Sequence, residues 1–422
     1  METEDLGCRS GLTASPCKGG VGIKYVSLSG PLGYAIAAKR YILALARTGI
    51  PVTWTPMVPD PIRNWEMEPF TGRTIGDAAL DAFCNTPIEY DTVIVHTPPE
   101  YFPSWVEREH GKKIVGCTVW ETDRAPGHWP PLLNSVHQLM VPCRWNKDVF
   151  QQCGVRTPIS VIPHLMNGGE AASGSASPWL VSPGDYVFYT IGTWTARKAV
   201  WDVIACYLDT FTASDRTVLI VKTNDYGYHE SLFGQGWIGR YAAAARWRFC
   251  KAVGIRPGRH DAIQLMGTLE PKYRSPAKIQ LVTQDMDEDV ILKLHEIGDC
   301  FVSLCRSEGW GLGAFDAAAY GKPIIMTGFG GQLDYLPPDL AYLVRYGMAP
   351  VRDDADPKNF TRDQKWAKPD LAHASQLMRQ VFENRAEAHN KGELLREHVH
   401  RTFREDAIVN EILRMVYGLH SR

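Results

Sequence analysis

The chain has 422 residues, of which 45% are hydrophobic and 22% are charged, and its formal net charge is −2. These values are typical of a globular protein with about two or three domains, and they exclude a strongly basic surface that would attract nucleic acid. No apolar run is long enough to span a membrane, although peripheral contact with a membrane stays open.

Residues 1–20 are rich in glycine, serine and cysteine without periodicity, and we expect them to form a disordered tail. The acidic start METEDLGCRS lacks the basic and apolar regions of a secretory signal. The ten cysteines include no Cys-x-x-Cys pair, which argues against a zinc or thioredoxin-type site. We therefore expect a cytoplasmic protein with reduced thiols.

Strands and helices alternate in the first half of the chain. A strand at 23–29 is followed by a turn at 30–33 and by a helix that ends at Gly49. The further strands expected in this half lie at 50–57, 92–96, 112–119, 137–142 and 160–164. This alternation predicts a parallel sheet with right-handed crossovers.

A run rich in glycine, serine and alanine begins at residue 167 and predicts a linker at 167–184. The strands expected after it lie at 186–192, 217–223, 262–268, 300–305, 323–327 and 341–345, and helices are expected from about 369 to 417. The fold class is therefore α/β, with two Rossmann-like doubly wound domains that face a central cleft. The N-terminal domain is expected at 21–166 and the C-terminal domain at 185–399.

The segment with the most chemical information is SLCRSEGWGLGAFDAAAYGKPIIMTGFGG. It predicts a strand, a loop with Glu308, Gly309 and Gly311, a helix at 312–320 that contains Asp316, and another strand. Glycines let backbone amides approach a ligand, and a helix N-terminus favours an anion, so this loop suits a diphosphate. The alternative is that Glu308 caps the helix and Asp316 lies on the surface. A glycoside hydrolase fits poorly, because the spacing places the two acids about 12 Å apart along one helix.

Two cations follow the first strand of the second domain. Arg197 and Lys198 are expected at the start of a helix, where their charge opposes the helix dipole unless an anion lies nearby. Lys222, at the end of the next strand, is a weaker candidate. The alternative is that these cations are solvated surface side chains.

The N-terminal half offers further candidates at strand ends. Gly30 and Gly33 follow the first strand, where glycines let a donor or an acceptor approach the chain, and the alternative is a plain turn. The pattern is not the Gly-x-Gly-x-x-Gly fingerprint of a dehydrogenase. His96, Glu121 and Asp123 are expected to face the central cleft, where they would orient an acceptor or stabilise charge. The alternative for a histidine such as His96 or His164 is a structural role.

The segment around Glu308 resembles the donor-site signature of the retaining glycosyltransferases of family four, which have the GT-B fold. The matching residues are Glu308, Gly309, Trp310, Gly311, Leu312, Gly321 and Pro323. The second acid of the signature is Asp316 here, where the family has Glu, and a later Gly-Gly-x-x-Glu element ends in Asp334. The resemblance implies that Glu308 faces the donor sugar, that Asp316 holds the ribose and that the residues after Glu308 belong to the donor site. It also implies that a helix at about 400–422 packs back on the N-terminal domain and completes it.

The same resemblance extends to the diphosphate. Lys198 matches a lysine that binds this group in the family, and Arg197 substitutes for an arginine that the family has at the position of Thr193. It implies that a sugar moves, with retention, from a UDP- or GDP-sugar to a glycan or lipid-linked acceptor, in polysaccharide synthesis. Because the sequence contains cations but no prominent Asp-x-Asp motif, we expect neither a metal nor a cofactor besides the donor. The alternatives are an inactive GT-B scaffold or sugar-binding module, and another GT-B enzyme such as a sugar-nucleotide epimerase.

Overall fold

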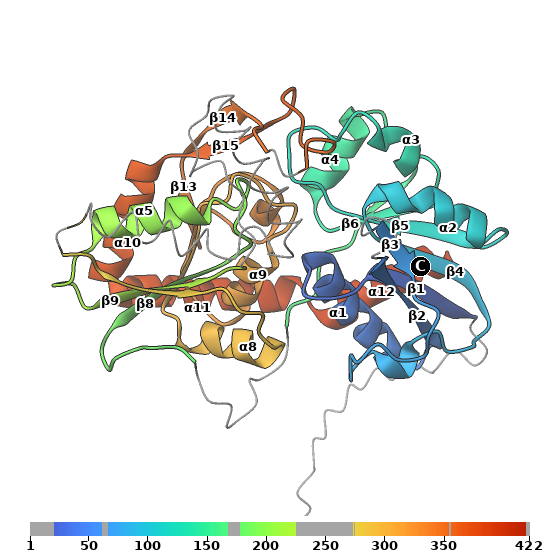
Figure 1. Cartoon of the computed structure of the whole chain (residues 1–422), viewed down its shortest axis with the longest axis horizontal. Helices are drawn as coiled ribbons and strands as arrows, with labels where there is room; N and C mark the ends of the chain where they lie inside the picture. Colours follow the sequence, from blue (N-terminus) through green and yellow to red (C-terminus); the bar gives the residue numbers. More distant parts are fainter. Residues whose placement is uncertain are drawn as a thin grey trace, which may run out of the picture.

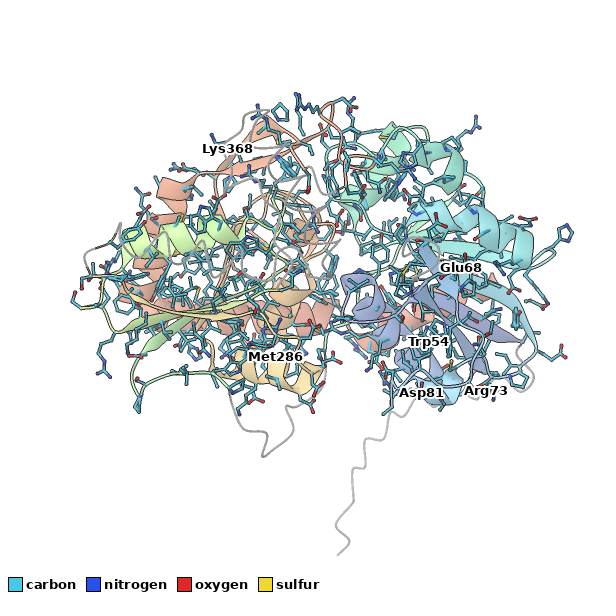
Figure 2. All side chains as sticks on the ribbon, viewed as in Figure 1. Trp54, Glu68, Arg73, Asp81, Met286 and Lys368 are labelled. Carbon is cyan, nitrogen blue, oxygen red and sulfur yellow. The ribbon has the colours of Figure 1, made fainter. Side chains whose placement is uncertain are left out.

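The computed structural model describes residues 21–60, 66–167, 178–224, 273, 275–353 and 356–418. These residues form two α/β halves that lie side by side, with the N-terminal half at the right of Figure 1. Side chains fill the interior of both halves (Figure 2). Trp54, labelled there, lies buried in the N-terminal half, and its indole nitrogen donates a 3.0 Å hydrogen bond to Ser27 Oγ.

The N-terminal sheet has seven strands. They are β1 Gly22–Leu28, β2 Val52–Asp60, β3 Glu66–Pro69, β4 Tyr90–His96, β5 Lys113–Cys117, β6 Gln138–Val141 and β7 Ile159–Val161. Their order is β3-β2-β1-β4-β5-β6-β7, and every pair is parallel except β2 with β3. The sequence predicts all of these strands except β3.

The C-terminal sheet has six strands, all parallel. They are β8 Tyr186–Ile191, β9 Thr217–Lys222, β10 Lys278–Val282, β11 Cys300–Ser303, β12 Ile324–Thr327 and β13 Tyr342–Val344. Their order, β10-β9-β8-β11-β12-β13, repeats that of the first sheet, with reversals at β1/β4 and at β8/β11. The expected strand at 262–268 lies outside the described residues, and β10 was not expected.

The central strands consist of continuous apolar runs, because helices cover both faces of a parallel sheet. In β9, for example, the four residues 218–221 are all buried. The helices are α1 Gly33–Arg47, α2 Phe102–Arg108, α3 Trp129–Leu133, α4 Arg144–Gln152, α5 Val200–Thr210, α8 Glu288–Ile297, α9 Leu312–Ala319, α10 Leu371–Glu383, α11 Arg385–Thr402 and α12 Glu405–Tyr417. No helix in the described ranges combines the length and apolar character that a membrane span requires.

The chain returns to the N-terminal half through its last helices, as Figure 1 shows for α11 and α12. Lys113 Nζ donates to the carbonyl of Met415 at 2.5 Å, and the Tyr417 hydroxyl donates to the carbonyl of Val21 at 2.7 Å. The last helix therefore packs against the N-terminal half.

A two-stranded hairpin leaves the C-terminal half and contacts the other half. Its antiparallel strands are β14 Tyr346–Pro350 and β15 Lys365–Pro369, neither of which was expected from the sequence. In the connection between them, the Phe360 ring stacks on Trp120 with the ring centroids 5.0 Å apart. This contact fixes the loop that follows β5, which belongs to the candidate site described next.

Candidate active site

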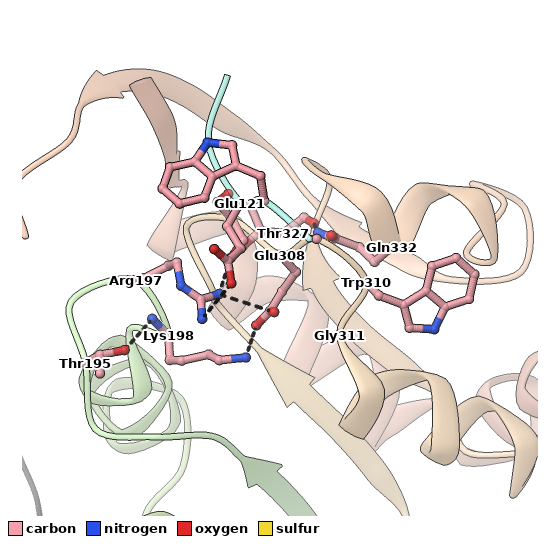
Figure 3. Close-up of polar contacts among 12 residues, drawn as sticks. Glu121, Thr195, Arg197, Lys198, Glu308, Trp310, Gly311, Thr327 and Gln332 are labelled. Carbon is pink, nitrogen blue, oxygen red and sulfur yellow. Dashed lines mark hydrogen bonds and ion pairs between the residues drawn. The ribbon is translucent and has the colours of Figure 1, made fainter. Parts of the chain in front are cut away.

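Three loops meet at the boundary between the two halves (Figure 3). They carry Arg197 and Lys198 after β8, Glu308 after β11, and Glu121 after β5 of the N-terminal half. The order of the C-terminal sheet reverses between β8 and β11, and doubly wound sheets bind ligands at the carboxyl ends of strands at such a point.

The turn before α5 presents the two cations. Arg197 and Lys198 were expected in the first turn of a helix, but this is wrong, because α5 begins at Val200. Ala199 has a left-handed φ of 47°, and the backbone N–H of Lys198 donates to Thr195 Oγ1 at 3.3 Å. The cations therefore lie in a separate turn beside the loop that follows β11, and not on the helix surface.

The side chains form an ion-pair network around Glu308. Lys198 Nζ donates to one carboxylate oxygen of Glu308, and Arg197 Nη1 donates to the other at 3.3 Å. The same Arg197 nitrogen donates to the carbonyl of Ser307 at 2.9 Å. The other terminal nitrogen of Arg197 lies 3.3 Å from Glu121 Oε1, so the network links the two halves.

At both Glu308 and Glu121, burial raises the pKa of the carboxyl group and the nearby cations lower it. Burial alone raises the pKa of Glu308, but the positive charges of Lys198 and Arg197 outweigh it and hold that pKa below its ordinary value. For Glu121 burial dominates, and with the repulsion of Glu308 it raises the pKa although Arg197 lies close. Glu308 is therefore the acid held ionised, and its charge is compensated by two cations.

The glycines after Glu308 allow the two halves to touch. A Cβ atom on Gly309 would overlap the Val119 side chain and lie 2.9 Å from the carbonyl oxygen of Trp120. The Cys143 thiol donates to the carbonyl of Gly309 at 3.1 Å. A side chain at position 309 would therefore push the N-terminal half away from the Glu308 loop.

A second glycine pair holds the Glu308 loop from the C-terminal side. Gly330 has a φ of 113°, and a Cβ there would lie 2.6 Å from the carbonyl oxygen of Glu308. The backbone N–H of Gly331 donates to that oxygen at 2.8 Å. Three residues on, Asp334 Oδ2 accepts a 2.9 Å hydrogen bond from the N–H of Arg144, the first residue of α4. The Gly-Gly-x-x-Asp element thus supports the loop and contacts the other half.

Trp310 and Gly311, two of the residues expected in the donor site, support the local structure around the Glu308 loop. The Trp310 side chain is 2% exposed and packs on Tyr335 and Phe403, so only its backbone lies near the loop. Trp310 was expected in the donor site, and the core packing of its indole leaves that ring no surface for a ligand in this structure. Gly311 adopts a φ of 88° and precedes Leu312, the first residue of α9. As the N-cap residue of α9, Gly311 makes no side-chain hydrogen bond to the helix N-terminus.

Asp316 lies in a buried ion pair, and not on the surface. Its carboxylate accepts hydrogen bonds at 2.9 and 2.6 Å from the guanidinium of Arg40, which belongs to α1 of the N-terminal half. It also accepts a 3.1 Å hydrogen bond from the backbone N–H of Asn167. Sequence reasoning missed Arg40, since a cation inside an ordinary helix carries no motif.

The two candidate histidines at strand ends of the N-terminal half are His96 and His164. His96 is buried and bonds the Tyr25 hydroxyl through Nδ1 at 2.9 Å, and burial lowers its pKa to about 3. His164 is also buried, and its Nδ1 lies 3.0 Å from the Tyr41 hydroxyl. Both imidazoles are therefore neutral and bonded within the core, which fits the structural alternative.

The remaining candidates are Asp123, Gly33 and Lys222. Asp123 Oδ1 accepts from the N–H of Lys365 at 2.6 Å, so this acid anchors the hairpin strand β15. Gly33 is the first residue of α1 and is exposed. Lys222 ends β9, and its ammonium donates to the carbonyl of Thr223 at 2.7 Å.

Across the described part of the chain, no three side chains of His, Cys, Asp or Glu are grouped as metal ligands. At the boundary the structure brings together two cations and two carboxylates, close to the loop that leads into α9. This set can bind an anion and stabilise charge that develops on it.

Several solved structures share this architecture. Sucrose-phosphate synthase from Thermosynechococcus elongatus has a TM-score of 0.60 at 13% sequence identity, over 94% of this chain and 98% of that chain. A glycosyltransferase from Rickettsia africae ESF-5 has a TM-score of 0.59 at 11% identity, over 95% and 98%. HepE from Anabaena, in complex with UDP-glucose, has a TM-score of 0.57 at 11% identity, over 95% and 100%.

No family model matches the sequence, and no curated protein sequence matches it. The likeness in structure, together with the two repeated sheet orders, shows that the chain has the GT-B fold with two Rossmann-like domains. The expectation for the fold is therefore confirmed.

Proposed function

We propose that the protein is a glycosyltransferase that moves a sugar from a nucleoside diphosphate to an acceptor hydroxyl. The observation that carries this proposal is the convergence of Arg197 and Lys198 on Glu308 at the switch point of the C-terminal sheet. A nucleoside diphosphate matches such a site because its charge pairs with the cations and its phosphates accept backbone N–H groups.

Bond cleavage between the sugar and the diphosphate places negative charge on the leaving phosphate and positive charge on the sugar. Lys198 and Arg197 would stabilise the leaving phosphate, with the amides at the start of α9 beside them. Glu308, kept ionised by its neighbours, would favour the positive charge on the sugar. The cations provide the charge that a divalent metal provides in other transferases, so the proposed transfer needs no metal.

The proposal extends to the substrates on the strength of similarity. The UDP-glucose complex of the structurally similar HepE makes a UDP-hexose the first donor to test, with GDP-sugars next. The resemblance of the Glu308 segment to family four supports retention and a glycan or lipid-linked acceptor. Polysaccharide synthesis in the cytoplasm, with or without peripheral membrane contact, is the setting proposed for the reaction.

A panel of radiolabelled sugar nucleotides tests the proposal. The purified protein is incubated with each donor, with and without simple glycan acceptors, and the release of the nucleoside diphosphate is followed. We expect one donor to be consumed, faster with an acceptor. Binding of a donor without consumption would indicate a sugar-nucleotide binding module. If the protein neither binds nor consumes any donor, the assignment is refuted.

A further inference from the structure

A second ion pair joins the two halves away from the Glu308 network. Arg40 of α1 meets Asp316 of α9 through two parallel hydrogen bonds of 2.9 and 2.6 Å. The side chains of Arg40 and Asp316 are only 11% and 8% exposed. A two-point contact between a planar guanidinium and a carboxylate fixes orientation as well as distance.

The segment that crosses between the halves is tied into the same pair. Arg40 Nη1 also donates to the carbonyl of Leu165 at 3.0 Å, and the N–H of Asn167 donates to Asp316 at 3.1 Å. Glu288, near the start of α8, lies 3.7 Å from Arg40 Nη2 and accepts from the Asn167 side chain at 2.7 Å. Elements of both halves and the crossing segment therefore meet at one guanidinium.

Asp316 and Glu308 belong to one continuous segment. The loop with Glu308 leads directly into α9, and Asp316 is the fifth residue of that helix. A force on the Asp316 carboxylate is therefore transmitted to the backbone that carries Glu308. The ion pair between Glu121 and Arg197 also crosses the boundary, and its length of 3.3 Å depends on how the two halves are spaced.

We propose that Arg40 is a positioning residue for the site: through Asp316 it holds α9 at the spacing from the N-terminal half at which Glu121 meets Arg197. Asp316 then acts through Arg40, in place of the ribose contact that the sequence resemblance implies. This inference rests on the proposed transfer for its activity readout, but its structural readout does not.

The test is a mutant cycle with Arg40→Gln, Asp316→Asn and the double variant. We expect each single change to lower the turnover number by about 10- to 100-fold, the range for a small misplacement of reacting groups. The double variant should lose no more than either single variant, because each change removes the same pair. The Michaelis constant for the donor should change much less than the turnover number.

Small-angle X-ray scattering of the same variants supplies the structural readout. The radius of gyration of the free protein should increase in all three variants as the halves separate. Arg47→Gln is the matched control, because Arg47 lies on the same helix in an exposed pair with Glu405. It should leave scattering and turnover unchanged.

Two further variants separate positioning from general instability. Arg40→Lys keeps the charge but loses the two-point contact, so it should restore part of the turnover. The reciprocal exchange, Arg40→Asp with Asp316→Arg, should restore more turnover than either of its single changes. Additive losses in the mutant cycle, or a change in the Michaelis constant alone, would assign Asp316 to the ligand and overturn the proposal.

The proposed function and this inference fail in different ways. If the wild-type protein consumes no donor, the transferase assignment fails, and the scattering comparison still decides the role of Arg40. If donor is consumed and all variants scatter like the wild type, the positioning role is refuted.

Discussion

Replacement of Lys198 by alanine is the perturbation whose effect can be worked out best from the structure. In the free protein the ammonium of Lys198 neutralises Glu308, and Arg197 divides its charge between Glu308 and Glu121. Loss of one charged hydrogen bond to a bound diphosphate costs about 1.5–3 kcal/mol. The affinity should therefore fall by about 10- to 150-fold, since each 1.4 kcal/mol is a factor of about ten.

The upper end of that range is expected. In the variant only Arg197 still compensates the charge of Glu308, so the Glu308 carboxylate repels the diphosphate more strongly. Titration calorimetry with UDP and GDP measures the dissociation constants directly. Lys293→Ala is the matched control, since Lys293 lies in a half-buried pair with Glu296 on α8, outside the cluster. If the affinity of Lys198→Ala for the nucleotide that binds the wild type is unchanged, Lys198 does not contact the diphosphate and the reasoning is wrong.

Three further outcomes are expected. Glu308→Gln should lower the turnover number by about 100- to 1,000-fold, while calorimetry shows nucleotide binding unchanged or tighter, because it removes a charge beside the reacting sugar; an equal loss in binding would contradict this role. Transfer should persist in excess EDTA, and activity lost to EDTA and restored by Mn²⁺ or Mg²⁺ would show that the cations do not suffice. Gly309→Ala should lower the melting temperature and turnover, because its Cβ overlaps Val119 and overpacking costs about 1–3 kcal/mol. Gly313→Ala, whose Cβ would meet atoms only at 3.6 Å or beyond, is its control, and equal melting temperatures would show that the contact at Gly309 adapts.

The sequence predicts those parts of the fold that depend on residues close together in the chain. Buried parallel strands require continuous apolar runs, and such runs identify the central strands of both sheets. The missed strands have no such run: β3 is EMEP, β10 is KIQLV, β14 is YGMAP and β15 is KWAKP. They form because a partner strand lies beside them in the folded protein, as β2 does for β3. The short segment alone does not predict that partner.

The candidate site also has parts that the sequence predicts and parts that it does not. The positions of Glu308 and of the cations follow from the rule that loops at the carboxyl ends of parallel strands converge, which needs only the order of elements. The Arg40–Asp316 pair joins two ordinary helices of different halves, so no local pattern predicts it. Trp310 matches a donor-site motif by type, yet its ring fills the core, because a motif specifies a residue and not the direction of its side chain.

The central claim is that a nucleoside diphosphate binds at the cluster of Arg197, Lys198 and Glu308. A crystal structure of the protein with the nucleoside diphosphate of its preferred donor tests that claim most directly. We predict density for the terminal phosphate within hydrogen-bond distance of Lys198 Nζ and the Arg197 guanidinium, at the N-terminus of α9. A nucleotide bound elsewhere, with the Lys198–Glu308 pair intact and no phosphate beside it, would contradict the account.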